Sequence, residues 1–106
     1  MAIVAVSISP IGEGVSVGRF VLETQKVLRR HPELRYRLDP MFTTIEGDLD
    51  DIFRVIREMQ EAVFAAGAQR VSTVMKIDDR RDKSVHMEDK VQSIEKQLAD
   101  DKNAFS

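Results

Sequence analysis

Cysteine and tryptophan are absent from this chain of 106 residues, and histidine occurs only at His31 and His86. Without cysteine the chain cannot form a disulfide, a thiolate nucleophile, an iron–sulfur cluster or a cysteine-ligated zinc site. Two histidines far apart in the sequence, with no clear third ligand, are a weak basis for a metal site. The sequence therefore predicts no metal centre and no cofactor.

A large excess of positive or negative charge is also absent. Sixteen Lys and Arg residues stand against 18 Asp and Glu residues, for a net charge of -2. A dedicated nucleic-acid binder usually carries a basic face, which this balance does not favour. The N-terminal apolar run, Ile3–Ile8, falls short of the ~20 residues of a membrane span, and no basic residue precedes it as in a signal peptide. We expect a cytoplasmic protein with neither a nucleic-acid nor a membrane partner.

The common catalytic signatures are lacking as well. The sequence has no GxGxxG, P-loop, GxSxG, HExxH or EF-hand pattern. The glycine-rich segment Pro10–Gly14 follows a predicted strand and precedes a predicted helix, but its spacing matches no phosphate-binding fingerprint. A plain turn is favoured there, with a ligand-binding loop as the alternative. We expect a protein that is not an enzyme.

What the sequence does contain is a regular succession of hydrophobic patterns. Alternating residues predict four strands, at Ala2–Ser9, Leu34–Leu38, Met41–Glu46 and Arg70–Asp78. Apolar residues at spacings of three and four predict three helices, with N-caps at Ser16, Asp48 and Ser84. The order βαββαβ plus a C-terminal helix is typical of an α+β ferredoxin-like sandwich, a four-stranded antiparallel sheet with two helices on one face. We expect one domain over residues 1–99 and a short, frayed polar tail over 100–106.

One face of this sheet is left without helices. It would expose Ile3 and Ala5, with Met41 or Phe42 and Val74 nearby. The last helix adds a narrow apolar stripe, made of Met87, Val91, Ile94 and Leu98. Contiguous apolar surface of this kind usually marks an interface, so the sequence predicts self-association.

Polar side chains gather at the ends of two strands that are neighbours in this fold. They are Ser7 and Ser9 on the first strand, and Thr43, Thr44 and Glu46 on the third. Short hydroxyls with a carboxylate can line a small pocket and exchange hydrogen bonds with a heteroaromatic ligand. The spacing alone equally suits ordinary strand threonines and a glutamate at a hairpin end.

Several segments occur together in a familiar order: Ser9–Gly12, Tyr36–Pro40, Thr43–Gly47, Gly67–Ala68 before Arg70–Val71, Ile77–Lys83 and Met87–Val91. Over about residues 2–98 the chain resembles the small thiamine-binding family related to YkoF. The resemblance implies a ferredoxin-like fold, homodimers or homotetramers, no catalysis, and binding of thiamine or its hydroxymethylpyrimidine moiety.

The adjacency of the strands, together with the motifs of this family, suggests roles for the polar residues. Hydroxyls and a carboxylate would satisfy the aminopyrimidine, and Glu46 would attract positive charge. Phe42 or Tyr36 would stack on a ring. At Phe42 the chain departs from the family pattern, in which a glycine is expected, and a bulky side chain there would narrow or reshape the pocket.

Other function classes share this architecture. A regulatory module for another small metabolite and a dimeric α/β-barrel enzyme remain alternatives. An RNA-recognition module would need exposed aromatics on its central strands, whereas the first strand presents Ala5, Ser7 and Ser9.

Overall fold

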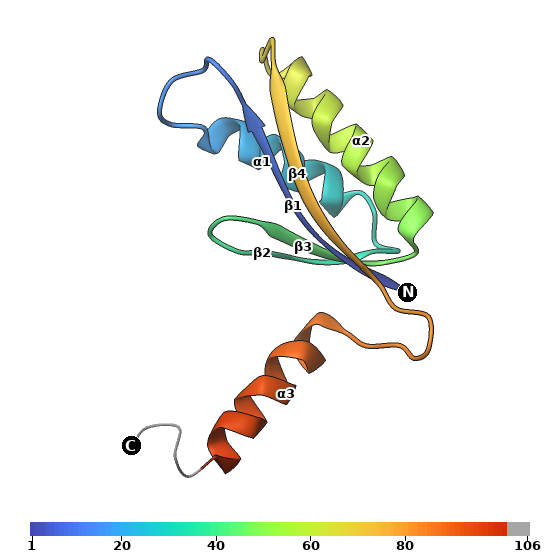
Figure 1. Cartoon of the computed structure of the whole chain (residues 1–106). Coiled ribbons are helices and arrows are strands. Elements are labelled where there is room, and N and C mark those ends of the chain that lie inside the picture. The colour runs from blue at the N-terminus through green and yellow to red at the C-terminus, as the bar shows by residue number, and fades with distance from the viewer. Residues whose placement is uncertain (102–106) are drawn as a thin grey trace.

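Seven elements follow one another in the computed structural model, which describes residues 1–101: β1 (Ala2–Pro10), α1 (Gly18–Arg29), β2 (Arg35–Leu38), β3 (Thr43–Gly47), α2 (Leu49–Ala65), β4 (Val71–Asp79) and α3 (Met87–Asp100). The strands form one antiparallel sheet in the order β2-β3-β1-β4, and α1 and α2 cover one of its faces (Figure 1). The predicted ferredoxin-like α+β fold is confirmed. Of the predicted frayed tail, residues 102–106 lie outside the described residues. No helix within residues 1–101 is long and apolar enough to cross a membrane.

The core lies between the sheet and the two helices that cover it. In β1 every second side chain from Ala2 to Ile8 is buried, because successive side chains of a strand point to opposite faces. These side chains meet the buried faces of α1 and α2, which contribute Phe20, Thr24, Val27 and Leu28, and Ile52, Val55, Ile56, Met59 and Val63. The other face of the sheet, with Ile3 and Ala5, receives neither helix.

The central strand β1 is longer than its neighbour β3, and this difference shapes the molecule. The β1–β3 pairing stops at Val6, which lies opposite Thr43, whereas the β1–β4 pairing continues to Pro10. Before β3 the chain turns back tightly, and the Asp39 N–H donates to the Phe42 carbonyl at 2.9 Å. A gap therefore opens between the last third of β1, the β2–β3 turn and α1.

Two of the three predicted helix caps are wrong. Asp48 caps α2 as predicted, and its Oδ1 accepts from the Asp51 N–H at 3.1 Å. The N-cap of helix α1 is Val17, one residue after the predicted Ser16, because the Val17 carbonyl already accepts the first helical bonds. The N-cap of helix α3 is His86, two residues after the predicted Ser84. Contacts to the sheet set that start.

Among the described residues, helix α3 is hydrogen-bonded to the sheet through its N-cap and first turn. Met87 is 5% exposed, but Val91, Ile94 and Leu98 are 45%, 56% and 48% exposed. The helix projects away from the sheet (Figure 1), and the Cα radius of gyration is 16.3 Å. A compact chain of this size has a radius of roughly 13 Å. Within residues 1–101 of a single copy, the apolar stripe of α3 beyond Met87 therefore stays largely exposed.

Candidate functional site

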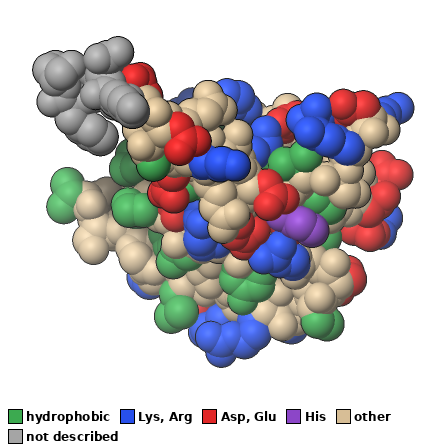
Figure 2. Space-filling view, turned by 90° about the horizontal axis from the view of Figure 1, so that it is seen from below, with side chains coloured by type: hydrophobic (Ala, Val, Ile, Leu, Met, Phe, Trp, Pro, Cys, Tyr) green, Lys and Arg blue, Asp and Glu red, His purple; other side chains and the backbone are tan. Residues whose placement is uncertain are grey.

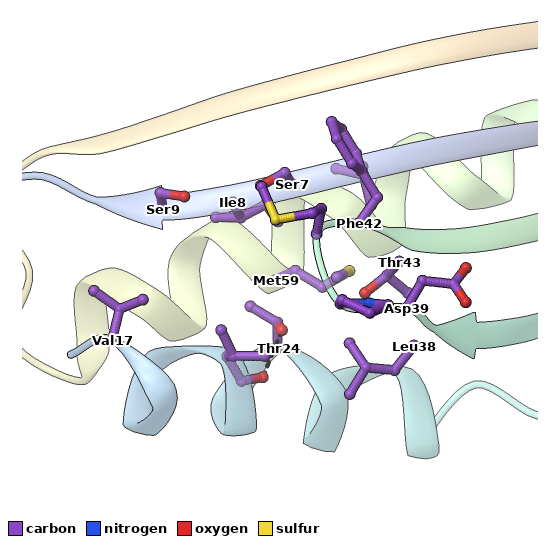
Figure 3. Close-up of a pocket in the computed structure, with 14 residues that line it drawn as sticks. Ser7, Ile8, Ser9, Val17, Thr24, Leu38, Asp39, Phe42, Thr43 and Met59 are labelled. Carbon is purple, nitrogen blue, oxygen red and sulfur yellow. Dashed lines mark hydrogen bonds between the residues drawn. The ribbon is translucent and has the colours of Figure 1, made fainter. Parts of the chain in front are cut away.

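A pocket of about 250 Å³ occupies the gap where β3 stops beside β1. Figure 3 shows its walls: β1 carries Ser7, Ile8 and Ser9 on one side, and α1 carries Val17 and Thr24 on the other. The β2–β3 turn closes one end, and Met59 of α2 lies behind. The volume lies just below the roughly 300–1,000 Å³ of most small-molecule sites. It therefore suits a single ring, or one end of a larger molecule.

Four hydroxyl side chains line this pocket: Ser7, Ser9, Thr24 and Thr43. The Thr24 hydroxyl is already committed, because it donates to the Val21 carbonyl at 2.7 Å. Gln25 Nε2 donates to Thr43 Oγ1 at 3.1 Å, which leaves the Thr43 proton for an acceptor on a ligand. Within residues 1–101, neither Ser7 nor Ser9 makes a side-chain hydrogen bond. Three hydroxyls are therefore available to a ligand, Thr43 from the helix-covered face of the sheet and Ser7 and Ser9 from the other face.

Asp39 is the one charged residue among the described residues that line the pocket. Its Oδ1 lies 3.3 Å from Arg37 Nε, and its Oδ2 accepts from Thr44 Oγ1 at 3.5 Å. The sequence alone predicts Asp39 only as part of a turn. A turn residue directly after a strand lies at the sheet edge where the hydroxyls gather, which was the available signal. Figure 3 shows this carboxylate directed away from Val17 and Thr24, so it can attract hydrogen-bond donors or positive charge at the end of the pocket rather than in its interior.

The residues predicted for the site fall into two groups. Ser7, Ser9, Phe42 and Thr43 line the pocket, whereas Thr44 and Glu46 do not. Thr44 reaches it only through its contact with Asp39. The structure thus brings four of these six side chains together and separates the other two from them.

Glu46 lies on the helix-free face of the sheet, under the start of α3, and is 2% exposed. Its Oε1 is 2.5 Å from Arg35 Nη1 and 2.8 Å from His86 Nδ1, and its Oε2 accepts from the Met87 N–H at 2.8 Å. Arg35 Nη2 also donates to Glu88 Oε1 at 2.6 Å, and this bond, with the Glu46 charge, raises the Arg35 pKa. Figure 2 views the side from which α3 projects and shows acidic and basic side chains interleaved around a histidine. The Glu46 carboxylate therefore anchors α3.

Phe42, at the position where the resemblance leads us to expect a glycine, is 37% exposed. Figure 3 shows its ring beside β1, directed away from Val17 and Thr24. The pocket keeps its volume of about 250 Å³ with this ring present. Phe42 thus forms part of the wall and leaves the interior open.

Comparisons with known proteins agree with this architecture. A family model described as "Thiamine-binding protein" matches residues 4–95. The UPF0045 protein YqgV of Bacillus subtilis is 46% identical over 102 residues, which cover 92% of this chain and 98% of the relative. A UPF0045 protein of Staphylococcus xylosus is 45% identical over 107 residues, covering 97% of this chain and 100% of the relative.

Solved structures share the fold. A hypothetical protein of Methanocaldococcus jannaschii superposes with a TM-score of 0.81 at 34% identity, over 89% of this chain and 95% of that one. A Thermotoga maritima protein, named for a proposed role in thiamine biosynthesis or salvage, has a TM-score of 0.74 over 88% of this chain and 97% of that one. At 19% identity, that second likeness shows the fold alone. The family-model match over residues 4–95 and the similarity to the relatives in Bacillus and Staphylococcus show that the chain belongs to the thiamine-binding protein family.

Proposed function

We propose that this chain is a non-catalytic cytoplasmic protein that binds thiamine, or its hydroxymethylpyrimidine moiety, in the pocket between β1, α1 and the β2–β3 turn. The observation that carries the proposal is the wall of this pocket. It combines available hydroxyls of Ser7, Ser9 and Thr43 with the carboxylate of Asp39, in a space sized for one ring. Membership in the thiamine-binding protein family supports the same ligand class.

The chemistry of the ligand matches this wall. An aminopyrimidine offers an amino donor and ring-nitrogen acceptors, which hydroxyls and a carboxylate can satisfy. The thiazolium ring of thiamine is a cation, which the Asp39 carboxylate attracts. In the proposed pose the pyrimidine enters the pocket and the thiazolium stays near its opening. There the aromatic ring of Phe42 contributes a cation–π contact of about 0.5–2 kcal/mol.

Self-association is the second part of the proposal. The stripe Val91, Ile94 and Leu98 is exposed along α3, and Val74 and Met41 are 57% and 78% exposed elsewhere on the surface. Burying apolar surface is favourable by roughly 25 cal/mol per Å². We propose that a second copy of the chain covers the α3 stripe in a dimer or tetramer.

The binding proposal is tested by a thermal-shift panel of thiamine, hydroxymethylpyrimidine, the thiamine phosphates and unrelated metabolites. A ligand that binds only the folded state raises the apparent melting temperature with its concentration. Thiamine or the pyrimidine should stabilise the protein, and Ser9→Ala should weaken that effect. Ser93→Ala is the matched control, because Ser93 lies on α3 outside the pocket.

A panel in which thiamine and the pyrimidine have no effect, while an unrelated metabolite stabilises the protein, would favour the regulatory-module alternative. Loss of the thiamine effect in Ser93→Ala as strong as in Ser9→Ala would place the binding site elsewhere.

A further inference from the structure

The backbone of β1, as well as its side chains, faces the pocket. β1 has β4 on one side along its whole length, but β3 on the other side only as far as Val6. Beyond Val6, the side of β1 turned toward the pocket has no neighbouring strand in the described sheet. In a strand the backbone N–H and C=O groups of alternate residues point to the same side. The register therefore decides which residue presents both groups to the pocket.

That register assigns the pocket-facing groups to Ile8. The Ile11 N–H donates to the Arg70 carbonyl at 2.8 Å, which continues the β1–β4 ladder past the strand end. Counting back in steps of two, the backbone groups of Ser9 and Ser7 point toward β4, and those of Ile8 point the other way.

Pro10 supports the same assignment independently. Proline has no N–H, so inside a sheet it fits where that group would face an open edge. Pro10 pairs with Val71 of β4 and has the same parity as Ile8. Its nitrogen therefore points, like that of Ile8, to the side of β1 that β3 does not cover beyond Val6.

The Ile8 donor and acceptor have no other partner among the described residues. No loop, turn or side chain within residues 1–101 forms a hydrogen bond with the Ile8 backbone, and the β3 ladder ends one pair earlier. Ile8 is itself part of the pocket wall. An N–H and a C=O of one residue thus stand side by side at the pocket, and such groups are normally satisfied by water or by a ligand.

We infer that the main chain of Ile8 recognises the aminopyrimidine edge of the ligand, an inference that rests on the proposed function. The exocyclic amino group donates to the Ile8 carbonyl, and the adjacent ring nitrogen accepts from the Ile8 N–H. The hydroxyls of Ser9 and Thr43 then serve the remaining polar atoms. Strand β1 acts toward the heterocycle as an open strand edge acts toward another strand.

This recognition predicts a sharp chemical preference. In the 4-oxo analogue of the pyrimidine, the amino donor becomes a carbonyl acceptor and the neighbouring ring nitrogen becomes a donor. The carbonyl oxygen of the analogue then faces the Ile8 carbonyl, and its ring N–H faces the Ile8 N–H. Neither pair can form a hydrogen bond, and unpaired buried groups weaken binding. The 4-oxo compound should bind about tenfold or more weakly than the amino compound. Side-chain hydroxyls alone would tolerate the exchange, because a hydroxyl can either donate or accept.

The test combines calorimetry with NMR on the full chain. Hydroxymethylpyrimidine and its 4-oxo analogue are titrated, and amide resonances are followed in ¹⁵N-labelled protein. The amide of Ile8 should shift strongly with the amino compound, while that of Val6, within the paired part of β1, should move little. Ile8→Pro removes the pocket-facing N–H together with the buried isoleucine side chain. It should therefore weaken binding more than Ile8→Val, which shortens the same side chain but keeps the N–H.

The possible failures are distinguishable. If Ser9 and Thr43 amides shift while Ile8 stays fixed, or if the two compounds bind equally, the Ile8 inference is wrong and the proposed function stands. If no resonance moves with thiamine or with the pyrimidine, both are wrong. Should Ile8→Pro fail to fold, the analogue pair and the Ile8 amide shift still decide.

Discussion

Glu46 Oε2 accepts a hydrogen bond from the Met87 N–H at 2.8 Å, and this contact ties the end of β3 to the first turn of α3. A carboxylate at a helix N-terminus is favourable, because the helix dipole is positive there and the first N–H groups lack helical partners. Arg35 and His86 complete the cluster from either side. The direction in which α3 leaves the sheet therefore depends on one buried side chain.

Replacing Glu46 should destabilise the protein. In Glu46→Ala the buried Met87 N–H loses its acceptor, which costs about 1–3 kcal/mol. The Arg35 guanidinium also loses a partner, but it is half exposed, so water replaces much of that interaction. Glu46→Gln keeps an acceptor oxygen and should cost less. Urea denaturation measures both, with Glu95→Ala on the exposed surface of α3 as the control. Equal stability of Glu46→Ala and wild type would contradict the anchoring role.

His31 should make stability depend on pH. Its Nε2 lies 2.7 Å from Glu58 Oε2 and its Nδ1 2.9 Å from Glu33 Oε1. These hydrogen bonds, that to Glu58 first, raise the His31 pKa above its ordinary value of 6.5. Protonated His31 therefore favours the folded state. The contribution is complete below about pH 6.5 and disappears as the pH rises through the raised pKa.

Denaturation curves from about pH 5.5 to about pH 9, with an NMR titration of the His31 ring, measure this effect. In His31→Gln the decrease of stability over that range should be smaller. A variant whose stability follows the same pH dependence as the wild type would show that His31 is not the responsible group.

A charged side chain in the apolar stripe of α3 should prevent self-association of the chain. Ile94 is 56% exposed in one copy, so Ile94→Asp should leave the fold of the single chain intact. Within an assembly the same aspartate is buried without a partner, which costs several kcal/mol. Sedimentation should show a smaller species for Ile94→Asp than for the wild type. Gln92→Asp, on the opposite side of α3, should not change the mass. A wild-type monomer at micromolar concentration would rule out the assembly.

Phe42 should distinguish between thiamine and its pyrimidine. Phe42→Leu keeps an apolar wall but removes the aromatic face, so it should weaken only the ligand that carries the cation. The expected loss for thiamine is about 0.5–2 kcal/mol, or roughly twofold to thirtyfold in affinity. Calorimetry with both ligands measures the difference. An equal loss for the two would assign Phe42 a purely steric role.

Much of the fold could be predicted because its signals are local. Alternation in Ala2–Pro10 and the three-to-four spacing in Leu49–Ala65 depend only on which residues are apolar. The Asp48 cap and Gly67, which has a φ of +116° just after α2, follow from the chemistry of single residues. Such features need no knowledge of what packs nearby.

The start of α3 and part of the pocket could not be predicted in this way. The serine at position 84 is a good cap by type, but Glu46 lies 41 positions from Met87 and fixes the helix start through a long-range contact. For the same reason the sequence predicts Glu46 as a ligand residue, whereas its partners in the structure are Arg35 on β2 and the start of α3. Asp39 reaches the pocket because β3 ends before β1 does, and strand lengths are set by register across the sheet.

Calorimetric titration of hydroxymethylpyrimidine into wild type, Thr43→Val and Thr73→Val tests the central claim most directly. Both threonines accept a hydrogen bond from a glutamine, Gln25 for Thr43 and Gln60 for Thr73, but only Thr43 lines the pocket. The account predicts saturable binding to the wild type, binding about twofold to tenfold weaker in Thr43→Val from the loss of one neutral hydrogen bond, and unchanged binding in Thr73→Val. Absence of binding heat in the wild type, or equal affinity in all three proteins, would contradict it.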